Sequence, residues 1–169
     1  LPGLVPGDAP TVIEARDLRV WFPIRRGLLR RTVGHVKAVD GASVSLRAGE
    51  TLGIVGESGS GKTTLALALM RLLPSEGPIV FLGRDLQGLQ GPALRPIRRD
   101  MQMVFQDPYG SLSPRMTVGQ IVGEGLGVHR LPGRPADLVA AILREVGLDP
   151  ATADRYPHEF SGGQRQRIA

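Results

Sequence analysis

The segment from residue 56 to residue 63 constrains the fold of this chain most. It reads Gly-Glu-Ser-Gly-Ser-Gly-Lys-Thr, which fits the pattern G-x-x-x-x-G-K-[ST]. A nearly all-apolar run (51–55) precedes it, and helical periodicity follows it over 62–73 and stops at Pro74. Glycines allow consecutive backbone N–H groups to turn toward one point, and a helix N-terminus adds positive potential there. The segment therefore predicts a strand, a phosphate-binding loop and a helix.

The residue types in this loop suit phosphate chemistry. Lys62 supplies a mobile positive charge for β- and γ-phosphates, and the Thr63 hydroxyl can ligate Mg²⁺. The chain uses arginine for nearly all of its 21 basic residues, and Lys37 is its only other lysine. We therefore predict Lys62 as a catalytic residue, and the expected nucleotide contacts are Gly56, Glu57, Ser58, Gly59, Ser60, Gly61, Lys62, Thr63 and Thr64.

The N-terminal third predicts a small antiparallel sheet. Apolar and polar residues alternate over 12–21 and again over 35–46, as in half-buried strands. Asp40-Gly41 is a turn pattern, and the basic, glycine-containing stretch 23–34 predicts a loop. Residues 1–10 are rich in proline and glycine and predict a disordered lead-in.

The rest of the chain predicts two further strands and then helices. The strands are expected at 79–82 and 101–106, and the pattern is helical from Thr117 onward. The clearest helix is 135–146, which has proline in its first turn, an apolar residue at every fourth position and Gly147 at the place of a C-terminal cap.

A second glycine motif lies about a hundred residues after the first. Residues 160–164 read Phe-Ser-Gly-Gly-Gln. Ser161 can cap a helix that begins there, and Gly162 and Gly163 leave N–H groups open for an anion. Ser-Gly-Gly-Gln alone also suits an ordinary turn. Its position after the phosphate loop and a helical stretch favours a second phosphate-binding helix start.

These two motifs together resemble those of the ABC ATPases, with Phe160 in place of the first residue of the signature LSGGQ. The resemblance implies an α/β P-loop NTPase fold: a RecA-like core with an N-terminal antiparallel β-subdomain and an inserted helical subdomain, incomplete at the C-terminus. It also implies that ATP is sandwiched in a head-to-tail dimer. The residues that would engage the γ-phosphate held by the opposite subunit are Ser161, Gly162, Gly163 and Gln164.

The resemblance also divides the chain. After the lead-in (1–10), residues 11–169 are expected to form a partial ABC ATPase domain. Its parts are an antiparallel β-subdomain (11–50), a P-loop core (51–106), and the Q-loop, helical subdomain and signature (107–169).

Two more positions acquire roles from the resemblance. Residues 104–108, Val-Phe-Gln-Asp-Pro, are similar to the family's Q-loop, in which Gln106 would reach Mg²⁺ and the attacking water. Adenine would stack on an aromatic residue near the N-terminal sheet. Phe22 aligns better with the family pattern and Trp21 is the alternative, although either could instead belong to the core of its strand.

Several longer strings, at 22–27, 37–41, 105–112 and 155–160, resemble the branch of dipeptide and oligopeptide importers. That branch implies an ATP-hydrolysing subunit on the cytoplasmic face of the inner membrane. Its partners would be a second ABC ATPase subunit, two transmembrane permease subunits and an extracytoplasmic solute-binding protein. Importers of nickel, glutathione or other small solutes share these strings, and a degenerate partner that binds ATP without hydrolysing it is the other alternative.

Composition excludes several other classes. The net charge is +5, but the arginines are spread along the chain apart from a small cluster at Arg25, Arg26, Arg30 and Arg31. Aromatic residues make up only 4%, so we expect no nucleic-acid partner. The chain has no cysteine, which excludes disulfides and thiolate metal sites. His158 precedes the signature, so it does not match the family's switch histidine and is expected to pack beside Tyr156.

No apolar run in these residues ends in Asp-Glu, so the family's Walker B aspartate and catalytic glutamate are absent from them. We expect a Mg²⁺-dependent ATPase as the parent protein, and only weak nucleotide binding by residues 1–169 alone. The acidic strand should lie next to the strand of the phosphate loop. An ABC ATPase of DNA repair or translation would carry a coiled-coil insertion or a duplicated cassette, and the sequence shows neither.

Overall fold

The computed structural model describes residues 9–27, 31–105, 110 and 112–169. The chain divides into two compact units, Leu1–Leu94 and Arg95–Ala169. Most of the predicted lead-in lies outside the described residues.

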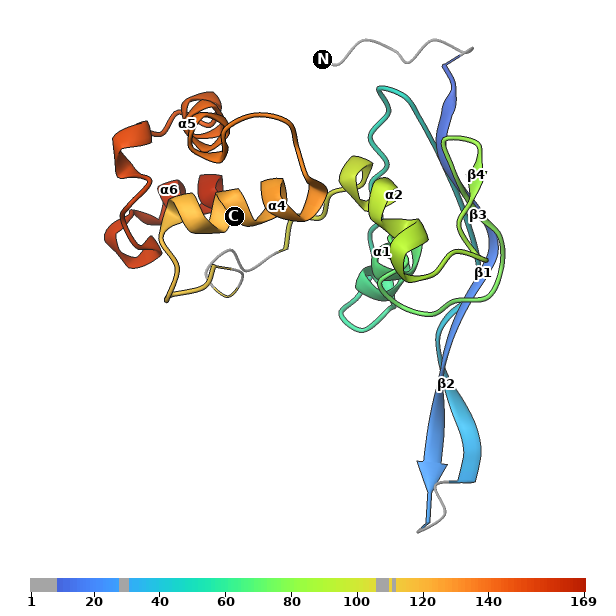
Figure 1. The fold of residues 1–169 in the computed structure, drawn as a ribbon. Coiled ribbons are helices and arrows are strands. Elements are labelled where there is room, and N and C mark those ends of the chain that lie inside the picture. The colour runs from blue at the N-terminus through green and yellow to red at the C-terminus, as the bar shows by residue number, and fades with distance from the viewer. Residues whose placement is uncertain (1–8, 28–30, 106–109, 111) are drawn as a thin grey trace. The chain divides into compact units, whose positions relative to one another are not determined.

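The first unit is built on a four-stranded sheet with the order β2-β1-β3-β4 (Figure 1). β1 (Thr11–Arg26) and β2 (Arg31–Arg47) form a long antiparallel hairpin. β3 (Ile79–Phe81) pairs with residues 13–15 of β1, and β4 (Arg84–Asp85) pairs with β3, both antiparallel. The prediction of an antiparallel N-terminal sheet is confirmed, and the strand expected at 79–82 also joins it.

Two local predictions in this sheet are wrong. The stretch 23–34 is not simply a loop, because β1 runs to Arg26 and β2 begins at Arg31. Asp40-Gly41 is not a turn between strands either. Leu18 pairs with Ala42 whereas Arg19 pairs with Asp40, so Gly41 is the extra residue of a β-bulge, and its φ of 79° suits that place. A bulge lets the strand continue through a sequence that otherwise predicts a turn.

Helix α1 (Lys62–Leu69) covers part of this sheet. It contacts β1 and β2 and buries Leu65 and Ala68. The buried apolar residues of the sheet are Ala15, Leu18, Val20, Val39, Ile79 and Phe81. The helix ends earlier than the predicted residue 73, because Arg71 adopts a positive φ of 54°, which no right-handed helix accommodates.

The two strands predicted for a parallel core do not form. Residues 51–55 and 101–105 have no regular structure, and most of their apolar side chains are exposed: Val55 is 92% exposed and Val104 85% exposed. A fully apolar strand is stable only when neighbours hydrogen-bond both its edges and cover both its faces. None of the described residues pairs with either segment.

The second unit is helical. It contains α2 (Arg95–Asp100), α4 (Val118–His129), α5 (Pro135–Glu145) and α6 (Gly162–Ile168), with single 3₁₀ turns at Pro150–Thr152 and Pro157–Glu159. The predicted helix at 135–146 is confirmed, and Gly147 takes the positive φ of 70° that ends it. Among the described residues, no helix is both long and apolar enough to cross a membrane.

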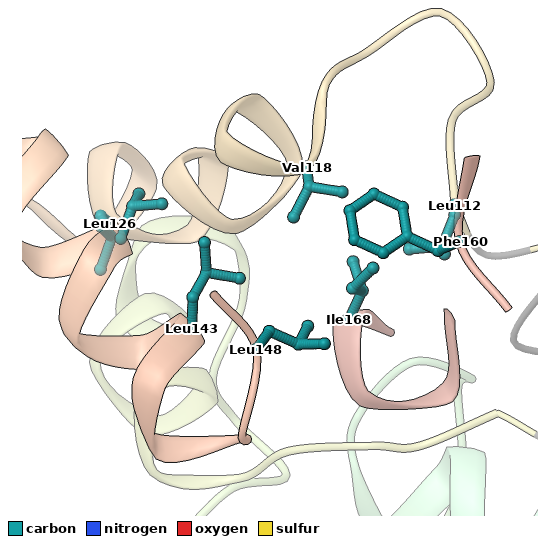
Figure 2. Packing of buried hydrophobic residues seen from close by; sticks show 8 residues of the cluster. Leu112, Val118, Leu126, Leu143, Leu148, Phe160 and Ile168 are labelled. Carbon is teal, nitrogen blue, oxygen red and sulfur yellow. The ribbon is translucent and has the colours of Figure 1, made fainter. Parts of the chain in front are cut away.

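One apolar cluster holds this unit together (Figure 2). It draws side chains from α4, α5, α6 and the intervening segments: Leu112, Val118, Leu126, Val139, Leu143, Leu148, Phe160 and Ile168. The N–H groups at the start of α4 are bound by a distant part of the chain, since Val118 donates to the Arg155 carbonyl (2.9 Å) and Gly119 to the Ala153 carbonyl (2.7 Å).

Candidate functional site

The loop at residues 56–61 closes around the side chain of Lys62. The ammonium group donates hydrogen bonds to the carbonyl oxygens of Gly56 (2.9 Å) and Glu57 (2.6 Å) and lies 3.4 Å from the Ser60 hydroxyl oxygen. The loop is exposed and leads directly into α1. The predicted turn is therefore present, and the Lys62 ammonium group lies at its centre.

Gly61 is required by its surroundings, whereas a side chain at position 56 would meet only the rotatable hydroxyl of Ser60. Gly61 has a φ of 90°, and a Cβ atom there would overlap the carbonyl oxygen of Ala38. A Cβ on Gly56 would lie 2.8 Å from the Ser60 hydroxyl oxygen. Ala38 is itself the extra residue of a bulge in β2, since Val20 pairs with Val39 and Trp21 with Lys37. The bulge thus presses the backbone of β2 against the start of α1.

The first turn of α1 can receive an anion. Its N-cap residue Gly61 supplies no side-chain hydrogen bond, and the turn holds no acidic residue. Such a turn leaves N–H groups to bind another acceptor. Thr63, in this turn, is exposed. Within the described segments no group of three or more His, Asp or Glu could hold a metal. Mg²⁺ commonly binds one or two protein oxygens together with the phosphates of a substrate. The Thr63 hydroxyl could supply such a protein oxygen once a phosphate is bound.

The structure separates the two aromatic candidates for the adenine platform. The Trp21 indole N–H donates to Asp40 Oδ1 (3.1 Å), and the Lys37 ammonium lies 4.4 Å from the indole ring centroid. Phe22 pairs with Val36 and, as the next residue along β1, lies on the opposite face of the strand. Trp21 is 38% exposed and Phe22 40% exposed, so the interpretation that either is a core residue is wrong.

The signature segment begins a helix, as predicted. Ser161 is the N-cap of α6: its hydroxyl accepts from the Gln164 N–H (3.3 Å), and the Gln164 side chain accepts from the Ser161 N–H (2.9 Å). This is a capping box, which satisfies two backbone donors reciprocally. Phe160, which replaces the family's leucine, is buried in the apolar cluster (Figure 2). Space beside Gly163 is open.

Arg167 positions this helix, and the sequence alone did not predict that role. Arg167 Nη1 donates to the carbonyl oxygens of Val146 and Gly147, both at 3.1 Å, and its Nε lies 3.4 Å from the Gly163 carbonyl oxygen. A cation at the last carbonyls of α5 also complements the helix dipole. The four-residue spacing of Gly163 and Arg167, which places them on one face of a helix, was the sequence pattern that could have indicated this contact. His158 stacks on Tyr156 at 5.8 Å between ring centroids, so its predicted packing is confirmed.

The predicted site residues are divided between the two units. The phosphate loop belongs to the first unit and the signature segment to the second. Gln106 lies outside the described residues, so its predicted contact with metal and water stays a prediction.

Comparison with known proteins gives this arrangement its context. The family model described as ABC transporter matches residues 39–169. A peptidoglycan transport ATP-binding protein, YejF, of Agrobacterium fabrum is 60% identical over 95% of this chain and 30% of its own length. An oligopeptide transport ATP-binding protein, AppF, of Bacillus subtilis is 52% identical over 94% of this chain and 49% of its own length.

A glutathione import ATP-binding protein, GsiA, of Escherichia coli is 52% identical over 95% of this chain and 26% of its own length. The chain therefore spans a quarter to a half of these relatives. The fold is similar to that of a solved dimeric ATP-binding cassette, MJ0796, bound to ADP and phosphate, with a TM-score of 0.74 and 23% identity over 92% of this chain and 66% of that one. With its phosphate loop, its capped signature helix and a family match over most of its length, this chain belongs to the ABC transporter family.

Proposed function

We propose that this protein is the ATP-binding and ATP-hydrolysing subunit of an ABC transporter that powers the import of dipeptides or oligopeptides. The observation that carries the proposal is the position of the Lys62 ammonium at the focus of the 56–61 loop, next to the uncapped first turn of α1. Loop amides, a helix N-terminus and a mobile cation together form a site for a triphosphate.

In this proposal Lys62 exchanges its carbonyl partners for phosphate oxygens. The ammonium now neutralises the partial negative charge of the Gly56 and Glu57 carbonyls. A triphosphate carries full negative charges and forms stronger, charge-assisted hydrogen bonds with the same group. Thr63 would hold Mg²⁺ through its hydroxyl, and the ion would supply charge neutralisation on the phosphates.

Phe22 is the better adenine platform of the two aromatic residues. The indole ring of Trp21 is already engaged by Lys37 and Asp40. The ring of Phe22 is exposed, on the other face of β1 from Trp21. Stacking of a base on an exposed ring needs no other contact to be broken.

The signature segment would act on a nucleotide held by another subunit. The open space beside Gly163 permits close approach of a phosphate to the backbone. Ser161 would exchange its bond to the Gln164 N–H for one to the γ-phosphate, and Gln106 would orient water near the ion. Closure of two such subunits would be transmitted to two permease subunits, with a solute-binding protein outside the membrane and the ATPase on its cytoplasmic face.

The names of the relatives support import of peptides or related small solutes. One relative is named for peptidoglycan transport, one for oligopeptide transport and one for glutathione import. Glutathione, nickel or another small solute is thus the alternative cargo. Uptake of labelled peptides by cells that express the full-length protein with its neighbouring permease genes, compared with uptake of glutathione and nickel, would distinguish these.

A matched pair of lysine variants tests the nucleotide site. Lys62→Ala should abolish binding of a fluorescent ATP analogue with Mg²⁺, and hydrolysis by the full-length protein. Lys37→Ala removes the only other lysine, whose contacts are with Trp21 and Asp40, and should leave binding nearly unchanged. Equal binding by wild type and Lys62→Ala would refute the proposal. Binding without hydrolysis in the full-length protein would instead identify a degenerate partner.

A further inference from the structure

The β1–β2 hairpin extends well beyond the part of the sheet in which β3 and β4 also take part (Figure 1). Among the described residues, β3 pairs with β1 only at residues 13–15, and the bridge from Arg19 to Glu76 is the last backbone pairing of β1 on that side. From residue 21 onward β1 pairs with β2 alone among the described residues. We call residues 24–26 and 31–36 the distal ribbon. A two-stranded ribbon in water is only marginally stable, so this one is suited to lie against something else.

The distal ribbon carries a concentrated positive charge. Arg25, Arg26 and Arg31 are exposed, and Arg26 lies directly opposite Arg31 in the strand pairing. Like charges in that arrangement destabilise a hairpin. The sequence has no acidic residue between Asp17 and Asp40, and within the described ranges none of the three arginines forms an ion pair. An anionic surface would relieve this repulsion.

Exposed aliphatic side chains lie among these charges. Ile24 is 41% exposed, Val33 59% and Val36 54%. A Cβ atom on Gly34 would lie 3.8 Å from Ile24 Cδ1, so the Ile24 side chain reaches across from β1 to β2. Single-stranded nucleic acids are commonly bound by stacking on aromatic side chains, and the nearest indole, that of Trp21, is already in contact with Lys37 and Asp40. Basic and aliphatic side chains on one element instead suit the boundary between lipid headgroups and acyl chains.

We propose that the distal ribbon binds the surface of an anionic phospholipid membrane. Arg25, Arg26 and Arg31 contact the headgroup phosphates and carboxylates, and Ile24 and Val33 enter the acyl boundary. The assignment goes beyond the nucleotide site and does not depend on it, because the ribbon contains none of the phosphate-loop residues.

Vesicles of phosphatidylserine mixed with phosphatidylcholine provide the direct test. Residues 1–169 should sediment with them and not with pure phosphatidylcholine. The sequence has a single tryptophan, Trp21, near the start of the ribbon, so its emission should shift to the blue and be quenched by brominated acyl chains. Binding that is equal on both kinds of vesicle, or that leaves Trp21 emission unchanged, overturns the proposal.

A triple variant, Arg25→Ala with Arg26→Ala and Arg31→Ala, should weaken binding about a hundredfold, because each arginine near the surface contributes about fivefold. The control removes the same charge elsewhere, from three exposed arginines outside the ribbon: Arg84, Arg115 and Arg144. It should bind as wild type. Equal loss in both triple variants would show that net charge alone is responsible and would overturn the assignment to the ribbon.

The apolar part is tested separately with Ile24→Ser and Val33→Ser in one chain. This variant should bind the phosphatidylserine vesicles at least tenfold more weakly, since each buried methylene contributes about fourfold. Duplex DNA of equal charge is the competing polyanion. If DNA binds more tightly than the vesicles, and if the serine variant binds the vesicles as wild type does, the ribbon is a nucleic-acid site and the lipid proposal is wrong.

Discussion

Two helices of the second unit begin with the same device, and this gives a matched experiment. Thr117 caps α4, and Ser161 caps α6. In each, the hydroxyl accepts from the N–H three residues on at 3.3 Å, and a glutamine side chain accepts from the cap's own N–H at 2.9 Å. Only the second cap belongs to the signature. Stability and function can therefore be separated by comparing the two.

Replacing Ser161 with alanine removes one acceptor and leaves the bond from the Ser161 N–H to Gln164 in place. Loss of such a cap lowers the free energy of unfolding by about 1 kcal/mol. For a unit the size of Arg95–Ala169 that corresponds to a fall in melting temperature of roughly 4–8 °C. Thr117→Ala should produce the same fall, because its geometry is the same.

Thermal and urea unfolding followed by circular dichroism would measure both losses. In the full-length protein, nucleotide-dependent dimerisation should weaken with Ser161→Ala and stay near wild type with Thr117→Ala. If Ser161→Ala leaves the melting temperature unchanged, the capping box does not contribute as argued. If both variants weaken dimerisation equally, the role of Ser161 is structural alone.

Three further predictions concern packing and the nucleotide. Gly61→Ala should abolish ATP-analogue binding while the protein stays folded by circular dichroism, because its Cβ would overlap the Ala38 carbonyl oxygen; normal binding would contradict the loop geometry. Leu143→Ala, at 1% exposure in the helical core, should cost about 3–5 kcal/mol in urea unfolding, and a loss under about 1 kcal/mol would disprove its packing. Phe22→Ala should weaken the ATP analogue about tenfold, whereas Trp21→Ala should not; the reverse result would exchange their roles.

The local backbone of both glycine motifs could be predicted from sequence, because each depends on neighbouring residues. A loop that must turn its amides inward requires glycine, and a helix start such as that of α6 requires a capping hydroxyl at Ser161. The helix at 135–146 was equally predictable from its proline, its apolar spacing and its terminal glycine. In these elements the residues that determine the local structure lie within the element itself.

The elements that failed depend on contacts with other segments rather than on their own residue types. Residues 51–55 have the composition of a buried strand, but composition does not provide the hydrogen-bonded neighbours that a strand needs. The stretch 23–34 has the charge and glycine of a loop, yet most of its described residues extend the hairpin, since each strand pairs with the other. Arg167 was missed for a similar reason: its acceptors lie about twenty residues earlier, at the end of α5.

The contact between the Ala38 carbonyl and Gly61 bears on how this protein can vary. A main-chain oxygen is present whatever side chain occupies position 38, so substitutions there should be tolerated. Inserting or deleting one residue between positions 37 and 41 should not be tolerated. Such a change would shift the register of β2, so the Ala38 carbonyl would no longer lie against Gly61. In a redesigned hairpin, the number of residues in this stretch should therefore be kept, whereas the residue type at position 38 can change.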